Sequence, residues 1–215
     1  MFLGGEDFDK IMSKYCQDEF EKAFDLDISG NAKALRKLST ASQKGKKLLS
    51  ESITTDIEVD DLAGDEDCSV PVSRAKFEAM CDPLFQKTIP VVEKVLNDAK
   101  LTQDEISDIV MVGGSTRIPI IREMISNFFN GRQLIHELDP DEAIAKGAAI
   151  LAANLIAQQS GEEFKSDDPA TNITGVKLTD VAPISLGIEA DEGKMEVMIP
   201  SNTPIPATFS KSFFT

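Results

Sequence analysis

The chain has 215 residues, 41% of them hydrophobic, which is enough to bury a core in one large or two small domains. Its formal net charge of -15 argues against general nucleic-acid binding, because such binding needs a basic face that displaces counterions. Cys16, Cys68 and Cys81 are widely spaced without a CxxC motif, and His136 is the one histidine. A disulfide framework or zinc site is therefore not expected. We expect the protein to lie in a reducing compartment. No apolar run reaches the length of a membrane span, and the first residues do not look like a signal peptide.

The first part of the chain predicts two amphipathic helices followed by two strands. Apolar residues recur at helical spacing over residues 8–24 and again over 34–49, with Ser-Gly-Asn between them. Residues 53–59 alternate apolar with polar side chains, and residues 68–72 supply a second short strand after an acidic connection, residues 60–67. A helical hairpin beside a β-hairpin predicts a compact α+β unit.

Capping signals mark the next elements. Ser73 is placed to cap a helix that we expect to break near Pro83 and then resume. Thr102 and Glu105 have the spacing of a capping box, just before the apolar run at residues 109–112. That run predicts a strand.

A glycine turn follows this predicted strand, in residues 112–119 (Val-Gly-Gly-Ser-Thr-Arg-Ile-Pro), and an apolar-periodic segment begins after it. Strand, glycine turn and helix together can hold a phosphate, because glycine lets the backbone approach an anion and the free N–H groups point at it. Ser115 and Thr116 add hydroxyl donors, and Arg117 is placed to contact what the phosphate is attached to. An ordinary tight turn remains the alternative. The motif is neither GxxxxGK[ST] nor GxGxxG.

Residues 139–142 (Asp-Pro-Asp-Glu) read as an N-cap, a proline at the first helical position and acidic groups in the first turn. The alanine-rich residues 142–158, with Gly147 among them, predict a helix that packs closely against a sheet. Residues 160–172 are polar and acidic and contain Pro169, so we expect a linker and a domain boundary there.

The last part of the chain predicts two more strands. They lie at residues 184–189 and 195–199, with a turn at residues 191–193. The prolines between residues 200 and 206 permit only edge or loop positions later.

Four stretches in one order resemble the 70-kDa heat-shock chaperone family: residues 3–9, 108–119, 139–143 with 147–149, and 180–189. The resemblance covers essentially the whole chain but only the middle of such a chaperone. It implies a fragment: the second lobe of the ATPase domain, the interdomain linker and the first strands of the peptide-binding domain.

The fold class implied is α/β, an actin-like ATPase lobe with a ribonuclease H-like core and an inserted α+β subdomain, followed by a truncated β segment. The expected parts are residues 1–81 (α+β subdomain), 82–158 (α/β core), 159–180 (linker) and 181–215 (first strands of the peptide-binding β domain).

The second helix carries a basic run, which by itself reads as a solvated face. In the family this helix grips adenosine with an acid, a lysine, an arginine and a serine, where this chain has Gln43, Lys46, Lys47 and Ser50. Gln43 brings no charge, and Lys47 cannot stack flat on adenine as a guanidinium does. Because Arg117 still clamps the base from the opposite side, the resemblance implies weakened but not abolished nucleotide contact.

Two further groups have both a structural and a binding interpretation. Gly4 and Gly5 make a loop and helix cap, and by resemblance lie near the ribose and phosphates. Asp141 stabilises its own helix as a first-turn acid, and by resemblance lines the nucleotide cleft. The cysteines and His136 are assigned to packing or surface. The expected nucleotide-binding residues are Gly4, Gly5, Gln43, Lys46, Lys47, Ser50, Gly113, Gly114, Ser115, Arg117 and Asp141.

The resemblance implies ATP or ADP as cofactor and a parent protein that is an ATPase. The groups that hold Mg²⁺ and act on the γ-phosphate belong in the family to sequence before Leu3, so no catalytic or metal-binding residue is expected here. Implied partners are unfolded client proteins, a J-domain co-chaperone and a nucleotide-exchange factor, with no nucleic acid or membrane, in the cytoplasm.

Two other functions stay open from sequence. A non-enzymatic relative acting as co-chaperone or scaffold with weakened nucleotide binding is favoured by Gln43, Lys47 and the polar residues 175–180. An ATPase of the actin and sugar-kinase type would share the lobe. Residues 180–189 argue against it, because they resemble the opening of a chaperone peptide domain.

Overall fold

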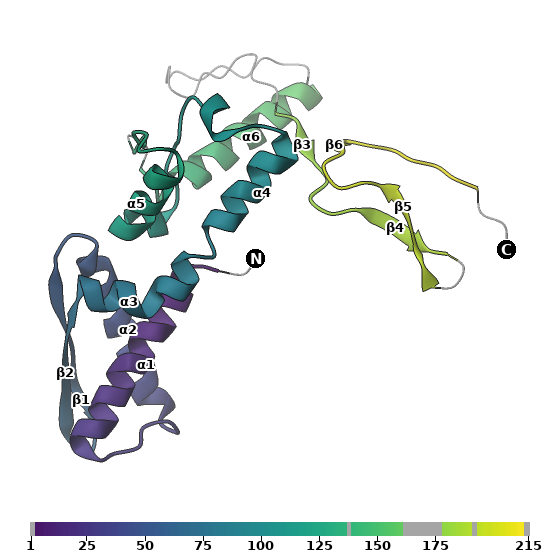
Figure 1. Cartoon of the computed structure of the whole chain (residues 1–215). Coiled ribbons are helices and arrows are strands. Elements are labelled where there is room, and N and C mark those ends of the chain that lie inside the picture. Colours follow the sequence, from purple (N-terminus) through teal and green to yellow (C-terminus); the bar gives the residue numbers. More distant parts are fainter. Residues whose placement is uncertain (1–2, 137–138, 161–177, 191–192, 213–215) are drawn as a thin grey trace. The chain divides into compact units, whose positions relative to one another are not determined.

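The computed structural model describes residues 3–136, 139–160, 178–190 and 193–212 (Figure 1). The chain divides into two compact units, Met1–Lys146 and Gly147–Thr215. The finer division at residues 81, 158 and 180 stays a prediction. The linker predicted at residues 160–172 lies outside the described residues except for its first position.

The first unit opens with the two predicted helices, α1 (Gly5–Phe24) and α2 (Ala32–Leu49). The Oδ1 atom of Asn31 accepts a hydrogen bond from the Ala34 N–H at 3.1 Å and so caps α2. The buried apolar side chains of α1 fall one turn apart, as the apolar spacing required: Phe8, Met12, Cys16 and Phe20.

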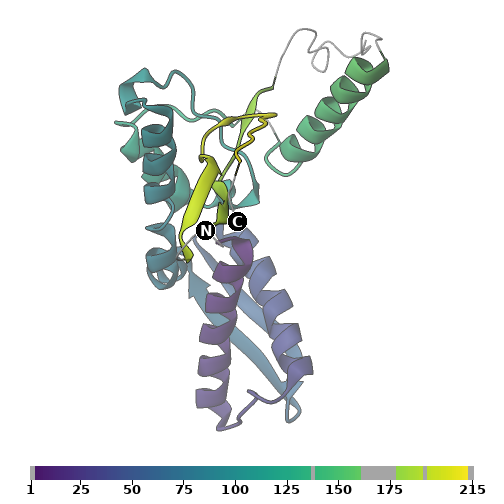
Figure 2. The ribbon, with the colours of Figure 1, turned by 90° about the vertical axis from the view of Figure 1, so that its right-hand side faces the viewer.

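Strands β1 (Thr54–Ala63) and β2 (Glu66–Ser73) form an antiparallel hairpin on which α1 and α2 pack (Figure 1, Figure 2). Ile57 pairs with Val70, and alternate residues of β2 are buried against the helices. The connection expected at residues 60–67 is shorter in the structure: only Gly64 and Asp65 lie between the strands. An irregularity in register lies between Val59 and Ala63, and there the Asp67 carboxylate accepts the Asp61 N–H at 2.7 Å.

Helix α3 (Arg74–Phe85) is capped by Ser73, whose hydroxyl accepts the Lys76 N–H at 3.1 Å. The break predicted near Pro83 is confirmed: α3 ends at Phe85, and α4 (Ile89–Ala99) follows. A proline in the last turn removes one hydrogen bond without ending the helix at that residue. The Phe85 ring then lies 4.9 Å from that of Phe8, which ties α3 to α1 in the core.

The strand predicted at residues 109–112 is reduced to a single parallel bridge between Val110 and Ile135. The Met111 N–H donates to the Ile135 carbonyl at 2.9 Å, and the Ile135 N–H to the Ile109 carbonyl at 2.8 Å. Val110 is 47% exposed. An apolar run becomes a regular strand only when neighbours pair with it, and among the described residues it has this one partner.

The capping box predicted at Thr102 is present, before the short 3₁₀ turn η1 (Gln103–Glu105). Helix α5 (Pro119–Phe128) follows the glycine turn, as predicted. Helix α6 (Ala143–Ser160) begins later than the N-cap predicted at Asp139, because the Asp139 carboxylate accepts the Asp141 N–H at 2.9 Å in a turn that precedes the helix. Helix α6 crosses the boundary between the two units, and its packing against a sheet stays a prediction.

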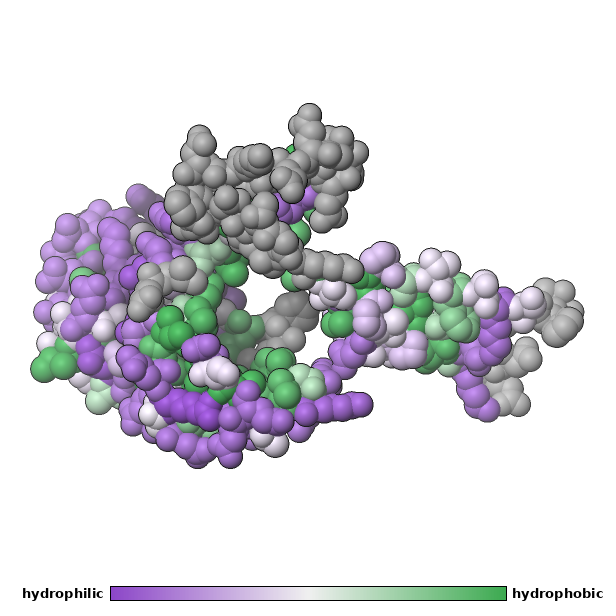
Figure 3. All heavy atoms as spheres, turned by 90° about the horizontal axis from the view of Figure 1, so that it is seen from above, coloured by the Kyte–Doolittle hydropathy of each residue, from purple (hydrophilic) through white to green (hydrophobic). Residues whose placement is uncertain are grey.

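The second unit carries β4 (Leu186–Glu189) paired antiparallel with β5 (Met195–Ile199), as predicted. The turn expected between them includes residues 191–192, which lie outside the described residues. Short strands β3 (Asp180–Val181) and β6 (Pro204–Ile205) form a second pair. Hydrophobic side chains are exposed along the β4–β5 hairpin (Figure 3): Leu186, Ile188, Met195 and Val197.

None of the helices among the described residues has the length and apolar character needed to span a membrane.

Gly45 sets how closely α2 approaches β1, because a Cβ atom there would overlap Cδ1 of buried Ile57. We expect Gly45→Ala to destabilise the first unit by about 1–2 kcal/mol, since overpacking exceeds the gain in helix propensity. Chemical denaturation monitored by circular dichroism measures this.

Gly147→Ala is the matched control, because Gly147 is also helical and has open space around it. Combining Gly45→Ala with Ile57→Val, which removes the clashing methyl, should cost less than the two single changes added together. Additive costs would contradict the proposed clash.

The strands of the second unit should exchange their amide hydrogens faster than α1 and α2, because two-stranded pairs with exposed apolar faces are only marginally stable. Hydrogen exchange read by mass spectrometry measures this. A dilution series is the control, since the same exposed edges favour pairing between chains. Protection of residues 186–199 that equals that of α1 at every concentration would contradict the expectation.

Candidate functional site

A cleft of about 720 Å³ opens in the first unit, where the start of α1, the end of α2 and the glycine turn meet. Residues from segments far apart in sequence line it: Gly5, Lys46, Lys47, Ser50, Glu51, Gly114, Ser115, Arg117, Ile118, Arg122 and Asp141.

The cleft brings together eight of the predicted residues: Gly5, Lys46, Lys47, Ser50, Gly114, Ser115, Arg117 and Asp141. Gly4, Gln43 and Gly113 do not line it. Glu51, Ile118 and Arg122 also line the cleft and were not predicted. Ile118 lies within the glycine motif and Arg122 one helical turn beyond it, so the 3.6-residue period was the available signal.

The glycine turn is built by Gly113, whose φ of +93° lies in the region that favours glycine. A 3₁₀ turn, η2 (Gly114–Arg117), stands between it and α5. The N–H groups that follow Gly113 therefore belong to η2 and not to α5, which begins with Pro119. Among the described residues, the N–H groups of Gly114 and Ser115 have no hydrogen-bond acceptor.

Thr116 has a structural role in place of the ligand contact expected for it. Its hydroxyl donates to the Gly113 carbonyl at 2.7 Å, and its N–H donates to the same oxygen at 3.0 Å. The Gly113 N–H in turn donates to the Pro140 carbonyl at 2.9 Å, which joins the turn to the segment before α6. The turn is therefore rigid apart from the two N–H groups left for a ligand.

Lys46 joins the two helices at the floor of the cleft. Its ammonium lies 2.8 Å from Oδ1 of Asp9 and donates to the Gly5 carbonyl at 2.9 Å. The side chain of Lys46 is 12% exposed and that of Asp9 is 8% exposed. The two groups form an ion pair, but their geometry does not make a hydrogen bond to Oδ1 of Asp9. In such a poorly hydrated place the pair fixes the ammonium, which keeps a further N–H for a ligand oxygen.

Asp141 is not the first-turn acid that was predicted, because α6 begins only at Ala143. It lines the cleft, and its carboxylate accepts a hydrogen bond from Arg117 at 2.6 Å, with Asp139 3.6 Å from the same guanidinium. All three side chains are about half exposed. Exposed ion pairs contribute little stability, so Arg117 is free to turn toward a ligand at small cost.

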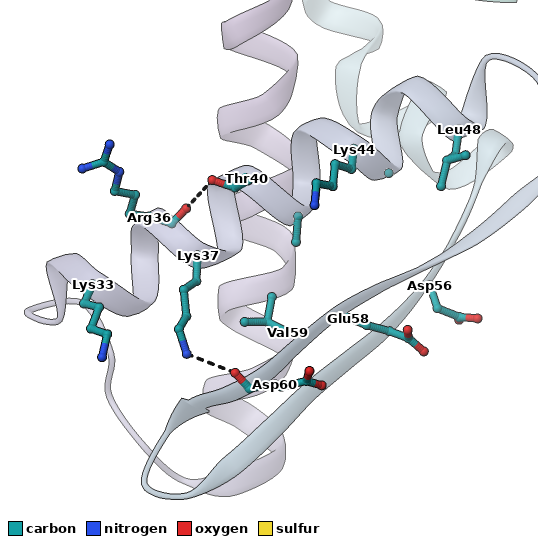
Figure 4. A pocket seen from close by; sticks show the side chains of 12 residues that line it. Lys33, Arg36, Lys37, Thr40, Lys44, Leu48, Asp56, Glu58, Val59 and Asp60 are labelled. Carbon is teal, nitrogen blue, oxygen red and sulfur yellow. Dashed lines mark hydrogen bonds between the residues drawn. The ribbon is translucent and has the colours of Figure 1, made fainter.

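A second groove, of about 640 Å³, lies between α2 and β1 (Figure 4). Lys33, Arg36 and Lys44 line it from α2, opposite the acidic Asp56 and Glu58 of β1. It contains none of the predicted nucleotide-binding residues. The basic run of α2 is thus divided between two faces, with Lys44 in this groove and Lys46 and Lys47 in the cleft.

The thiols of Cys16, Cys68 and Cys81 are free and buried, and His136 is exposed, as predicted. Burial raises the pKa of the Cys16 and Cys81 thiols to about 12, so both are neutral at physiological pH. Within the described ranges, no three His, Cys, Asp or Glu side chains are grouped to hold a metal ion.

The family model described as Hsp70 protein matches residues 1–215. The chain belongs to the Hsp70 family. It is 43% identical to a heat shock 70 kDa protein of Neurospora crassa over 213 residues, which are 99% of this chain and 32% of the relative.

Heat shock cognate 70 kDa protein 3 of Dictyostelium discoideum is 44% identical over 99% of the chain and 32% of its own length. A ribosome-associated molecular chaperone of Saccharomyces cerevisiae is 41% identical, over 99% of the chain and 33% of its own length. The chain thus spans about a third of the length of these Hsp70 relatives. Membership of the Hsp70 family implies an actin-like fold and nucleotide binding.

Lys47→Arg should strengthen ADP binding about three- to tenfold, because a planar guanidinium stacks on adenine where an ammonium does not. Isothermal titration calorimetry on the 215-residue chain measures the affinity. Lys44→Arg, on the same helix but in the second groove, is the matched control and should change nothing. No gain from Lys47→Arg would mean that α2 does not contact the base.

Proposed function

We propose that this chain is the adenosine-gripping second lobe of an ATP-dependent molecular chaperone, with the linker and first strands of its peptide-binding domain. The observation that carries the proposal is the cleft. Lys46 and Lys47 of α2, and Ser50 at its C-cap, share with Ser115 and the glycine turn one cavity of about 720 Å³.

The residues present fit a nucleotide in three ways. The unpaired N–H groups of Gly114 and Ser115 suit a phosphate, as at other backbone anion sites. The fixed ammonium of Lys46 and the hydroxyl of Ser50 suit ribose hydroxyls. Arg117 suits the base, and its exposed pairing with Asp141 is weak enough to rearrange.

Mg²⁺ fits less well on this chain, because its described residues offer no carboxylate cluster for it. ATP hydrolysis needs the metal, a positioned water and charge-stabilising groups at the γ-phosphate. We assign these to sequence outside this chain. The parent protein is proposed to be an ATPase, and this lobe to bind and orient the adenosine side of the nucleotide.

The proposal extends to architecture and partners on the strength of family membership. We assign residues 1–81 to an α+β subdomain inserted in a ribonuclease H-like core (82–158), followed by a linker (159–180) and peptide-domain strands (181–215). Unfolded client proteins, a J-domain co-chaperone and a nucleotide-exchange factor are the proposed partners, and the cytoplasm the proposed location.

The alternative of a non-enzymatic co-chaperone or scaffold is less well supported. Gln43 lies outside the cleft and Lys47 replaces the arginine of the family, which favours weakened binding. The relatives, however, carry the names of heat-shock proteins and ribosome-associated chaperones. An ATP-regulated chaperone with reduced nucleotide affinity accommodates both observations.

The 215-residue chain should bind ADP but show no ATP turnover, because one lobe cannot position water and metal around the γ-phosphate. Calorimetry measures binding, and a coupled phosphate-release assay measures turnover.

Ser50→Ala should weaken ADP binding about five- to tenfold by removing one ribose hydrogen bond. Thr40→Ala, at an exposed position in the second groove, is the control. Hydrolysis that survives stringent purification would overturn the assignment of catalysis to other sequence, and no ADP binding at millimolar concentration would overturn the nucleotide function.

A further inference from the structure

Four cationic side chains line the cleft, and they differ in what already neutralises them. Lys46 is held by Asp9, and Arg117 by Asp141 and Asp139. Within the part of the chain that the structure describes, Lys47 and Arg122 lie within ion-pair distance of no carboxylate. These two cations are therefore the ones whose charge an incoming ligand meets uncompensated.

Arg122 is the better placed of the two. Its Nε donates to the Thr116 carbonyl at 2.6 Å, and the side chain is partly buried, whereas Lys47 is exposed. The terminal amino groups of Arg122 have no protein acceptor among the described residues. The guanidinium is thus held at one edge, so little conformational entropy remains to be lost when it meets a ligand.

The surroundings of Arg122 suit a base better than a phosphate. The unpaired N–H groups that suit a phosphate lie at Gly114 and Ser115, where η2 begins. Arg122 is anchored to Thr116, toward the other end of η2, and lies one helical turn after buried Ile118, which also lines the cleft. An apolar side chain beside a planar cation matches an aromatic ring, whereas a phosphate would be desolvated against Ile118.

We propose that Arg122 contacts the adenine base, presenting its guanidinium plane in the role that Lys47 cannot fill. This inference rests on the proposed nucleotide function and adds a base-recognition residue to that site. The cleft then holds two guanidinium groups from neighbouring turns, Arg117 of η2 and Arg122 of α5. In the family pattern, one guanidinium comes from α2 and the other from the glycine turn.

The test compares adenosine with tripolyphosphate, so that base and phosphate contacts are measured separately. Ligand-detected NMR titrations on the 215-residue chain are made for Arg122→Lys, which keeps the charge but not the plane, and for Arg122→Gln. Arg36→Gln, an exposed arginine of the second groove, is the matched control. Both Arg122 variants should weaken adenosine about three- to tenfold and leave tripolyphosphate unchanged.

The other outcomes overturn the inference in distinguishable ways. Loss of tripolyphosphate affinity alone would make Arg122 a phosphate contact. Equal loss of both ligands would mean that Arg122 only supports the glycine turn through Thr116, and unchanged affinities would mean that it touches no ligand. If the unaltered chain bound neither adenosine nor tripolyphosphate, the proposed function itself would fail, and this inference with it.

Discussion

The buried ion pair between Lys46 and Asp9 is the constraint on which the cleft depends. With side chains 12% and 8% exposed, neither charge has enough water to stand alone. Removal of one partner from such a pair costs about 3–5 kcal/mol, because the other is left uncompensated. Together with the hydrogen bond from Lys46 to the Gly5 carbonyl, the pair fixes the start of α1 against the end of α2. The cleft wall that faces the glycine turn is thereby a single rigid surface.

The charge of the cleft runs against that of the chain. The net charge is -15, yet four of the eleven residues that line the cleft are cationic and two, Glu51 and Asp141, are acidic. An anionic ligand responds to the local field, since the Debye length at physiological salt is about 8 Å. The acidity that excludes general nucleic-acid binding is therefore compatible with a site for a single nucleotide.

The sequence pattern predicted the helices and caps, whose stability depends on nearby residues. It failed for the strand, whose formation depends on pairing with distant segments. The helices α1 and α2 and the Ser73 cap follow from apolar spacing and side-chain chemistry within a few residues. Residues 109–112 have the composition of a strand, but strand formation depends on partners that periodicity does not reveal. In the cleft, eight residues chosen from the motif and the resemblance lie together, whereas Glu51 and Arg122 belong to no motif and become neighbours of those residues only through the tertiary fold.

The glycine turn shows how a short motif can hold backbone N–H groups ready for a ligand. Thr116 satisfies the Gly113 carbonyl with both its hydroxyl and its N–H, and its own carbonyl accepts from Arg122. The Gly113 N–H is held by Pro140. Once these bonds are made, the N–H groups of Gly114 and Ser115 remain without acceptors among the described residues, in a backbone that has little freedom to rearrange. These N–H groups are already ordered when the chain has folded. The binding of an anion therefore loses little conformational entropy at this turn.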